Sequence, residues 1–321
     1  MKKFDVTALG EILIDFTFAG LSDRGEHLFE QNPGGAPANV LAAVTKLGGN
    51  TSFIGKIGKD MHGKFLKNTV EKYGIDTSSL IETDEAFTTL AFVDLNENGD
   101  RSFSFARKPG ADTLLSDSDI SKEQIEGSKV FHFGSLSLTD EPARGATLKA
   151  LQYAKEYGVI VSYDPNYRPS LWKGEATAKD GMRLPLEMVD IIKISDEEME
   201  LLTDCNTPVD AADVLHKKGI ACVIITMGEK GAFVSANGES VFVEGVQTKV
   251  VDTTGAGDCF MGAFLYSILN DNKKLSEFCE KDLKNYASFA NAAASICVSR
   301  RGAINAMPST EEVEGIIKKL Q

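Results

Sequence analysis

Three small residues, Gly255, Ala256 and Gly257, precede the carboxylate of Asp258 and an apolar, helix-spaced segment from Met261 to Leu269. Small residues leave the first backbone N–H groups of a helix uncovered, at the positive end of the helix dipole. Such a helix start binds phosphate, or the charge that develops on a phosphoryl group during transfer. A carboxylate repels phosphate, so we expect Asp258 to serve as the general base that removes the proton of an alcohol acceptor.

A purely structural role for the same segment is the alternative. Asp and Thr cap helices and Gly opens turns, so the string from Asp252 to Asp258 can join a strand to a helix without any ligand. The length of the string and its place at a predicted strand-to-helix junction favour the functional interpretation.

Two strings in the chain resemble the signatures of the ribokinase-like (PfkB) carbohydrate kinases. Asp-Thr-Thr-Gly-Ala-Gly-Asp at 252–258 resembles their C-terminal signature, and Gly-Gly-Ala-Pro-Ala-Asn at 34–39 resembles their N-terminal one. Matching elements continue along almost the whole chain. The resemblance implies an α/β fold, with a Rossmann-like, mostly parallel sheet flanked by helices and a small β-sheet lid. It also implies ATP-dependent phosphorylation of a sugar.

The bulk composition restricts the partners. The net charge of −13 disfavours nonspecific binding to nucleic acids or anionic membranes, which requires basic patches. The five cysteines form no Cys-x-x-Cys pair, which is typical of reduced thiols in the cytoplasm. We expect no signal peptide and no membrane-spanning segment. Positive potential for ATP must therefore come from helix ends, a few Lys and Arg residues and a divalent metal.

The order of elements predicts how these residues are positioned. From about residue 130, apolar strand-like runs alternate with helix-like segments, which predicts a parallel sheet in a single domain spanning 1–321. Residues 4–16 are predicted to form a strand, interrupted at Gly10, and a hairpin is predicted from 88 to 107 with its turn at 96–100. In the family, segments equivalent to 16–32 and 86–108 form the lid, which often supplies a dimer interface, so a homodimer is expected.

Four residues near the N-terminus are predicted to bind the sugar. Asp15 ends the predicted strand 4–16, where open α/β sheets place their ligands. Gly34 and Gly35 let a ligand approach the backbone, and the amide of Asn39 both donates and accepts, which suits a polyol. The matching family residues contact the sugar. A strand-end cap for Asp15, and a turn with a helix cap for the others, are the structural alternatives.

Four further residues complete the predicted sugar site. Phe103 and Arg107 share one face of the second hairpin strand, so Arg107 is expected to point at the substrate or, as an edge charge, at solvent. Asn166 and Arg168 follow a strand in the string 164–172, which is similar to one in fructokinases and ketodeoxygluconate kinases. A guanidinium group there can meet sugar oxygens or the transferring phosphate.

The resemblance also implies nucleotide and metal sites. The predicted ATP-binding residues are Lys193, Ser195, Thr226, Gly228, Gly231, Gly257 and Asn291. Ser195 replaces an Asn that many family members have, and Glu198 is expected to order Mg²⁺ through water. The acidic residues around Glu198 would also favour a helix dipole without a metal. Backbone carbonyls near five residues are predicted to hold a monovalent cation such as K⁺: Asp252, Thr254, Cys297, Arg300 and Gly302.

The sequence therefore predicts a carbohydrate kinase that converts D-fructose to fructose 6-phosphate. Arg107, Pro109, Asp112 and the string 164–172 favour fructose. Ketodeoxygluconate, ribose and nucleosides are the alternatives within the class. A non-catalytic sugar or nucleotide sensor is the alternative from another class, but a sensor has no need of the base Asp258.

Overall fold

The computed structural model describes residues 2–95 and 101–320, with the backbone alone at 94, 95 and 101–103. One large sheet contains β1 (Phe4–Leu9), β4 (Thr51–Gly58), β5 (Asp76–Thr83), β8 (Ser128–Gly134), β9 (Ile160–Asp164), β10 (Ile191–Ser195), β11 (Cys222–Thr226), β12 (Gly231–Ala236) and β13 (Glu239–Glu244). Within the described residues it has nine strands in the order β13-β12-β11-β10-β9-β8-β1-β4-β5. Only β12 and β13, at one edge, pair antiparallel.

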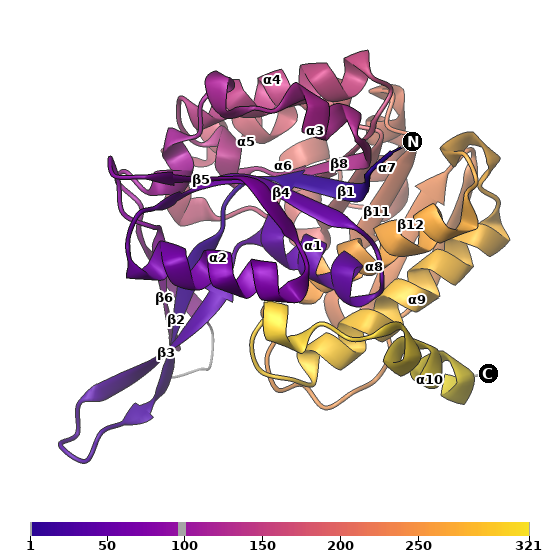
Figure 1. The fold of residues 1–321 in the computed structure, drawn as a ribbon. Helices are drawn as coiled ribbons and strands as arrows, with labels where there is room; N and C mark the ends of the chain where they lie inside the picture. The colour runs from indigo at the N-terminus through magenta and orange to yellow at the C-terminus, as the bar shows by residue number, and fades with distance from the viewer. Residues whose placement is uncertain (1, 96–100, 321) are drawn as a thin grey trace.

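Helices cover both faces of the large sheet (Figure 1). One face packs against α1 (Ala36–Lys46), α2 (Met61–Tyr73), α8 (Ala256–Asp271), α9 (Glu280–Val298) and α10 (Thr310–Leu320). The other face packs against α3 (Lys122–Glu126), α4 (Ala143–Glu156), α5 (Glu175–Arg183), α6 (Asp196–Thr203) and α7 (Pro208–Lys217). None of the helices in the described residues is both long enough and apolar enough to cross a membrane.

The central strands are apolar on both sides because helices cover both faces. In β10 and β11, Ile191, Ile192, Ile194 and the run Cys222 to Ile225 are fully buried. Short 3₁₀ helices connect many of the elements: η1 (Ala111–Leu114), η2 (Asp117–Asp119), η3 (Leu136–Leu138), η4 (Pro169–Leu171), η5 (Leu186–Met188), η6 (Gly228–Lys230), η7 (Leu275–Glu277) and η8 (Ile304–Ala306). This architecture confirms the predicted fold class.

A separate small sheet projects from the carboxyl ends of the large one (Figure 1). It contains β2 (Leu13–Leu21), β3 (His27–Gly34), β6 (Leu90–Leu95) and β7 (Arg101–Ala106), in the order β3-β2-β6-β7. The predicted hairpin strands pair antiparallel as β6 and β7. Its predicted turn, 96–100, lies outside the described residues.

The structure corrects two predicted boundaries. Residues 4–16 form two strands in different sheets, because Gly10, with φ of 154°, ends β1 and turns the chain toward β2. Asp15 therefore lies inside β2, opposite Asn32, and not at the end of a buried parallel strand. In the described residues no strand leads directly into Asp252, because β13 ends at Glu244 and the chain up to Gly255 is irregular.

Candidate active site

A cavity of about 730 Å³ lies between the carboxyl ends of the large sheet and the small sheet. It brings together sugar-site and catalytic candidates that are far apart in the sequence. The predicted residues in its lining are Asp15, Gly35, Asn39, Asn166, Arg168, Lys193, Ser195, Glu198, Thr226, Thr254, Gly255, Ala256, Gly257 and Asp258. Because this set comes from both sheets and from α1, α6 and α8, the cavity exists only in the folded chain.

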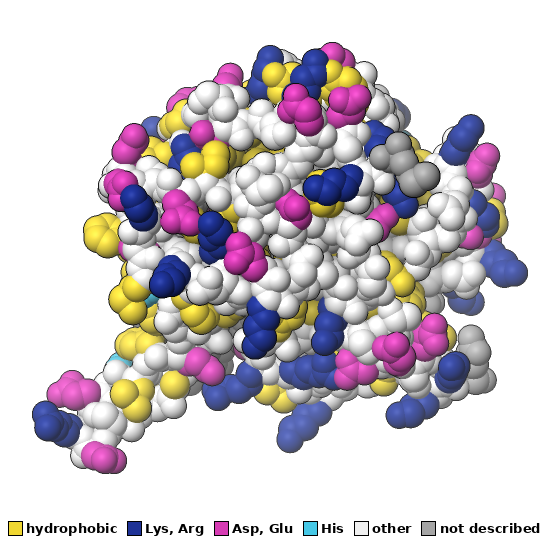
Figure 2. Space-filling model, viewed as in Figure 1, with side chains coloured by type: hydrophobic (Ala, Val, Ile, Leu, Met, Phe, Trp, Pro, Cys, Tyr) yellow, Lys and Arg dark blue, Asp and Glu magenta, His cyan; other side chains and the backbone are white. Residues whose placement is uncertain are grey.

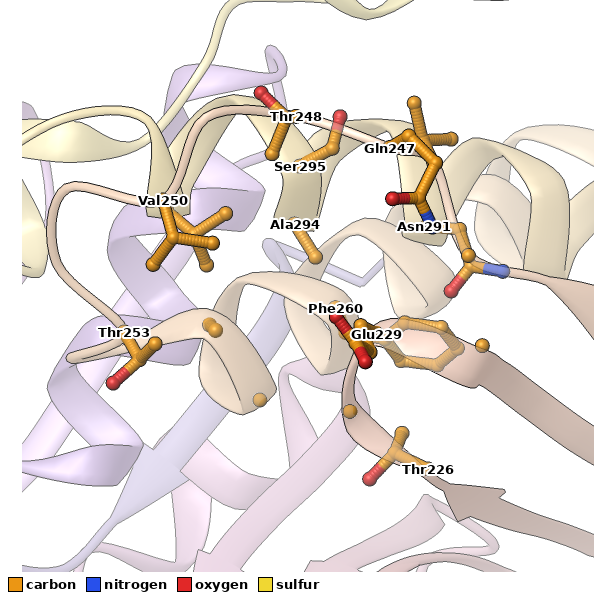
Figure 3. A pocket seen from close by; sticks show the side chains of 17 residues that line it. Thr226, Glu229, Gln247, Thr248, Val250, Thr253, Phe260, Asn291, Ala294 and Ser295 are labelled. Atoms are coloured by element: carbon orange, nitrogen blue, oxygen red, sulfur yellow. The ribbon is translucent and has the colours of Figure 1, made fainter.

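Figure 3 shows a second cavity, of about 410 Å³. Five predicted ATP-binding residues line it: Thr226, Gly228, Gly231, Gly257 and Asn291. Apolar side chains also line it and can pack against the base of a nucleotide: Val246, Val250, Phe260, Ala294 and Val298. The two cavities share Thr226, Thr253, Ala256 and Gly257, so they meet at the beginning of α8.

The first turn of α8 is the meeting point and carries no side-chain cap. Gly255 precedes it in the left-handed conformation, with φ of 76°, and a methyl group at this position would lie 2.7 Å from Ala303 Cβ. The amide of Ala256 donates weakly to the Thr253 carbonyl, at 3.3 Å. The early amides of a helix lack intrahelical acceptors. Gly257 lines both cavities, so its amide is the strongest candidate anion donor.

Asp258 lies in this turn and is buried. Its Oδ2 accepts a hydrogen bond from Asn39 Nδ2 at 2.8 Å. Burial, followed by the negative charge of Asp164, raises the pKa of Asp258 to about 6, although Asn39, Lys193 and Arg168 oppose the increase. A carboxyl with this pKa is a stronger base than an ordinary aspartate and is still largely ionised at neutral pH.

The contact between Asn39 and Asp258 gives Asn39 a role that the sequence did not predict. Asn39 lies in the first turn of α1, whereas Asp258 lies in the first turn of α8. The Nδ2 group of Asn39 fixes the carboxylate of Asp258. The other side-chain atom, Asn39 Oδ1, is buried and has no hydrogen-bond partner among the described residues. That oxygen is available to a hydroxyl donor in the cavity.

The raised pKa of the buried Asp258 predicts how turnover depends on pH. A general base acts only when it is ionised, so we expect kcat/KM to fall as the pH decreases through about 6. Replacing Asp164 by Asn removes a negative charge that raises this pKa, so the acid limb should move to lower pH. A profile measured with saturating ATP checks this, and a limb that stays in place or moves to higher pH would contradict it.

Lys193 supplies the buried positive charge of the cavity. Its Nζ lies 2.9 Å from Asp164 Oδ2, and both side chains are almost inaccessible to solvent. Burial alone would lower the pKa of Lys193, but Asp164 and Glu198 outweigh it and raise the pKa, so the amine is charged. A methyl group on Gly257 would lie 3.4 Å from Nζ, which places the amine beside the first turn of α8.

Ser195 and Glu198 form a capping box at the start of α6. Ser195 Oγ accepts from the Glu198 amide at 3.2 Å, and Glu198 Oε2 accepts from the Ser195 amide at 2.8 Å. Glu198 Oε1 accepts from the Tyr167 amide at 2.6 Å. The alternative role of Glu198, stabilising the start of a helix without a metal, is thus present in the fold. Both residues also line the sugar cavity, where Glu198 retains lone pairs for an ordered water.

The glycine pair positions Asp15 and the floor of the cavity. A methyl group at Gly34 would collide with the Asp15 carboxylate, and one at Gly35, with φ of 112°, would collide with the Glu11 carbonyl. Gly35 lines the cavity, whereas Gly34 is buried behind Asp15. The two glycines therefore act by letting the backbone segments approach closely.

Arg107 departs from its predicted position. The alternative of a solvent-facing charge is wrong, because the side chain is buried. Its guanidinium group donates from Nε to Asp112 Oδ2 at 2.7 Å, from Nη1 to Thr139 Oγ1 at 2.9 Å and from Nη2 to the Leu136 carbonyl at 2.9 Å. Arg107 does not line the sugar cavity. Leu136 does, so Arg107 supports the cavity wall through its hydrogen bond to the Leu136 carbonyl.

The side chain of Phe103 lies outside the described residues. Phe105, two residues further along β7, lines the cavity.

The residues predicted to hold a monovalent cation come together beside α8. Asp252 Oδ1 accepts from the Thr254 amide at 2.8 Å, and Oδ2 accepts from the Gly302 amide at 3.1 Å. The Arg300 amide donates to the Cys297 carbonyl at 3.1 Å, while the Cys297 thiol lies 4.0 Å from the Thr254 carbonyl. The described residues contain no cluster of His, Cys, Asp and Glu that could hold a metal directly. The hydrogen bonds between the segments 252–254 and 297–302 hold them against each other.

Ten residues of the cavity lining were missed from the sequence, among them Glu11, Phe105, Leu136 and Asp164. Asp164 belongs to the string 164–172 and ends β9, so its position at a carboxyl strand end was a usable signal. Glu11 directly follows Gly10, in the short connection between β1 and β2. No local spacing marks Glu11, because only the divergence of the two sheets brings it to the cavity.

The fold and the paired cavities define a phosphotransferase of the ribokinase-like class, with a carboxylate and a helix N-terminus at the junction of two ligand sites. Comparison with known proteins agrees. The family model "pfkB family carbohydrate kinase" matches residues 3–310. The chain belongs to the pfkB family of carbohydrate kinases.

Individual relatives cover the chain almost completely. A probable fructokinase-5 from Arabidopsis thaliana is 41% identical over 98% of this chain and 97% of its own length. The ATP-bound fructokinase from Xylella fastidiosa has a TM-score of 0.91 and 32% identity, over 100% of this chain and 99% of its own. The fructokinase from Vibrio cholerae O395, solved with fructose, ADP and a calcium ion, has a TM-score of 0.88 and 30% identity, over 98% and 99% of the chains. A double mutant of that enzyme was solved with fructose, ADP and a potassium ion.

Proposed function

We propose that this kinase transfers the γ-phosphoryl group of ATP to the primary hydroxyl of D-fructose and forms fructose 6-phosphate. The main support is the buried Asp258, which is held by Asn39 at the junction of the sugar and nucleotide cavities. The relatives named fructokinase, similar over nearly the full chain, support fructose as the acceptor.

The proposed mechanism assigns one task to each element of the cavity. Asp15, Gly35 and Asn39 position the sugar, together with Asn166 and Arg168. Asp258 takes the hydroxyl proton while the sugar oxygen forms a bond to the γ-phosphorus and the bond to the β-phosphate oxygen breaks. ADP leaves as the anion of that oxygen.

Charge that develops on the transferring group is stabilised by the residues around the first turn of α8. The Gly257 amide donates at the helix N-terminus, and the Lys193 amine lies beside it. We propose that ATP extends from there along Thr226, Gly228 and Gly231 toward Asn291. The Asn291 Nδ2 group donates to the carbonyls of Val243 and Glu244 at 3.2 and 3.0 Å, so Asn291 also fixes the end of β13.

Metal ions complete the proposed chemistry. The carboxylate oxygens of Glu198 and Asp164 are hard donors that suit Mg²⁺ through its water shell, and Asp164 Oδ1 has no hydrogen-bond partner among the described residues. When bound, Mg²⁺ would neutralise the charge of the ATP phosphates. The loop carbonyls around Thr254, Cys297 and Gly302 would hold K⁺ and thereby fix the chain next to Gly255.

Ketodeoxygluconate remains the second candidate acceptor, because Arg168 places a cation in the sugar cavity. Ribose and nucleosides are the other acceptors to compare. A coupled assay of ADP release with fructose, ketodeoxygluconate, ribose and adenosine separates them. We expect fructose to give the highest kcat/KM, and loss of activity on addition of EDTA. A higher value for another acceptor would replace fructose in the proposal, and no ADP release with any of them would support a sensor.

We further propose that the small sheet is a lid and that it carries a homodimer interface within the single domain 1–321. Asp15 and Phe105 line the cavity from one face of this sheet. The opposite face carries the aromatic side chains of Phe16, Phe18, Phe29 and Phe92; Phe18, Phe29 and Phe92 are exposed.

A second copy of the chain, docking through its own aromatic face, would bury these rings. Hydrophobic side chains are visible along the projecting sheet in Figure 2, which otherwise shows mixed charges. Sedimentation of the wild type and of Phe29→Glu tests this: a monomeric wild type would rule the dimer out. For the location we propose the cytoplasm, supported by the five free cysteines; cell fractionation tests it.

A further inference from the structure

Glu11 is a carboxyl group at the sugar cavity that the proposed mechanism leaves without a task. It lies in the connection between β1 and β2 and is 2% exposed. Its Oε1 accepts a hydrogen bond from the Ala36 amide at 3.0 Å, at the first residue of α1. The N-cap residue of α1 is Gly35, which has no side chain for this purpose, so Glu11 supplies the cap.

The second oxygen of Glu11 is the informative one. Oε2 is buried and has no hydrogen-bond partner among the described residues, although Glu11 lines the cavity. A buried polar atom without a partner is costly, and in a ligand site it indicates a group that the ligand satisfies. Another buried acceptor around the same cavity is in the same state, Asn39 Oδ1. A set of unsatisfied acceptors is complementary to a molecule with several hydroxyl donors.

A cationic side chain near Glu11 already has other partners, so it does not occupy the Glu11 Oε2 atom. Arg107 and Asp112 form a buried ion pair near it, and the Arg107 donors are engaged by Asp112, Thr139 and Leu136. Burial, and to a lesser extent the charge of Asp112, raises the pKa of Glu11 to about 7. A sugar hydroxyl can pair with either form of this carboxyl, because it both donates and accepts.

The position of Glu11 along α1 indicates which part of the sugar it addresses. Glu11 is bound at Ala36, and Asn39, which holds the base Asp258, lies three residues further along α1. Three residues of an α-helix rise by about 4.5 Å. Glu11 and the base are therefore anchored at different levels of the same helix, which fits contacts with two different hydroxyl groups of one sugar.

We propose that Glu11 is a specificity-determining residue whose Oε2 binds one secondary hydroxyl of the sugar. This inference rests on the proposed sugar kinase function and adds to it a contact at a residue that neither signature string contains. The contact would select sugars that carry a hydroxyl at this place, because a sugar without it leaves the buried carboxyl unpaired.

The test compares fructose with its monodeoxy analogues, each lacking one secondary hydroxyl. Dissociation constants are measured by titration calorimetry for the wild type and for Glu11→Gln, which keeps an acceptor for the Ala36 amide. For one analogue, the wild type should bind about 10- to 100-fold more weakly than it binds fructose. Glu11→Gln puts an amide donor where the Oε2 acceptor lies, so it should bind fructose more weakly and should distinguish fructose from that analogue less than the wild type does. For the other analogues, the loss of affinity relative to fructose should be the same in both proteins.

Asp112→Asn is the matched control, because it removes a carboxylate from the same buried cluster but not from the cavity lining. It should retain the discrimination of the wild type. If Glu11→Gln does not fold, Glu11→Asp serves instead, since its carboxylate is withdrawn by one methylene group. A Glu11 variant that discriminates among all analogues as the wild type does would overturn the proposal. Wild-type turnover of fructose tests the proposed function separately, because the affinity ratios do not depend on catalysis.

Discussion

Replacement of Asp258 by asparagine is expected to lower kcat by about 10²- to 10⁴-fold. Asparagine fills the same space, and its oxygen can still accept the hydrogen bond from Asn39 Nδ2, which is 2.8 Å from Asp258 Oδ2. It cannot accept the proton of the sugar hydroxyl. Affinity for the sugar should therefore change little, and ADP release measured beside sugar titrations separates the two effects.

A matched control for this variant is Asp282→Asn. Asp282 also lies buried in the first turn of a helix, α9, but it pairs with Lys273 and is remote from both ligand cavities. Its turnover should stay within about 3-fold of the wild type, an allowance for small structural effects. Near-normal turnover by Asp258→Asn would remove the base from the mechanism.

Replacement of Lys193 by methionine is expected to lower the free energy of unfolding by about 3–5 kcal/mol. The wild-type amine lies 2.9 Å from Asp164 Oδ2, and Glu198 and Asp258 are the other carboxylates of its surroundings. Without Lys193 these buried negative charges lose their compensating charge. The acid limb of kcat/KM should also move to higher pH, because Lys193 lowers the pKa of Asp258. Denaturant titration and a pH profile measure the two effects.

Two further variants make this prediction specific. The double variant Lys193→Met, Asp164→Asn should recover part of the lost stability, since it removes the unpaired partner. Lys155→Met breaks an ion pair of similar length, 2.8 Å to Asp190, but at a solvent-exposed position. It should cost less than about 1 kcal/mol. If Lys193→Met were as stable as Lys155→Met, the buried charge would have no structural importance.

The paired cavities explain how a strongly acidic chain can handle ATP. Its positive potential is local, and it comes from the start of α8 and the buried Lys193. Lys193 also acts on Asp258, whose pKa reflects the balance between burial and Asp164, which raise it, and Asn39, Lys193 and Arg168, which lower it. Binding and base strength are therefore coupled through one small cluster of groups.

The sequence by itself determined the type of fold, and it placed the predicted anion site and the predicted base together at the start of one helix. Gly255, Gly257 and Asp258 are neighbours in the chain, and the start of a helix imposes their relative positions. The alternation of apolar strands with helices likewise predicts a parallel sheet, because covered strands must be apolar on both faces. Such features depend on local spacing, so they can be inferred without the structure.

Only the tertiary structure decided which distant groups meet. Asn39 holds Asp258 across 219 residues of sequence, Asp164 pairs with Lys193 from the next strand of the sheet, and Arg107 turns inward to Thr139 and the Leu136 carbonyl. Glu11 reaches the cavity because the chain leaves one sheet at Gly10 and enters another at Leu13. These contacts depend on strand order and on the angle between the two sheets. No local pattern of residues encodes either of them, so they followed only from the assembled fold.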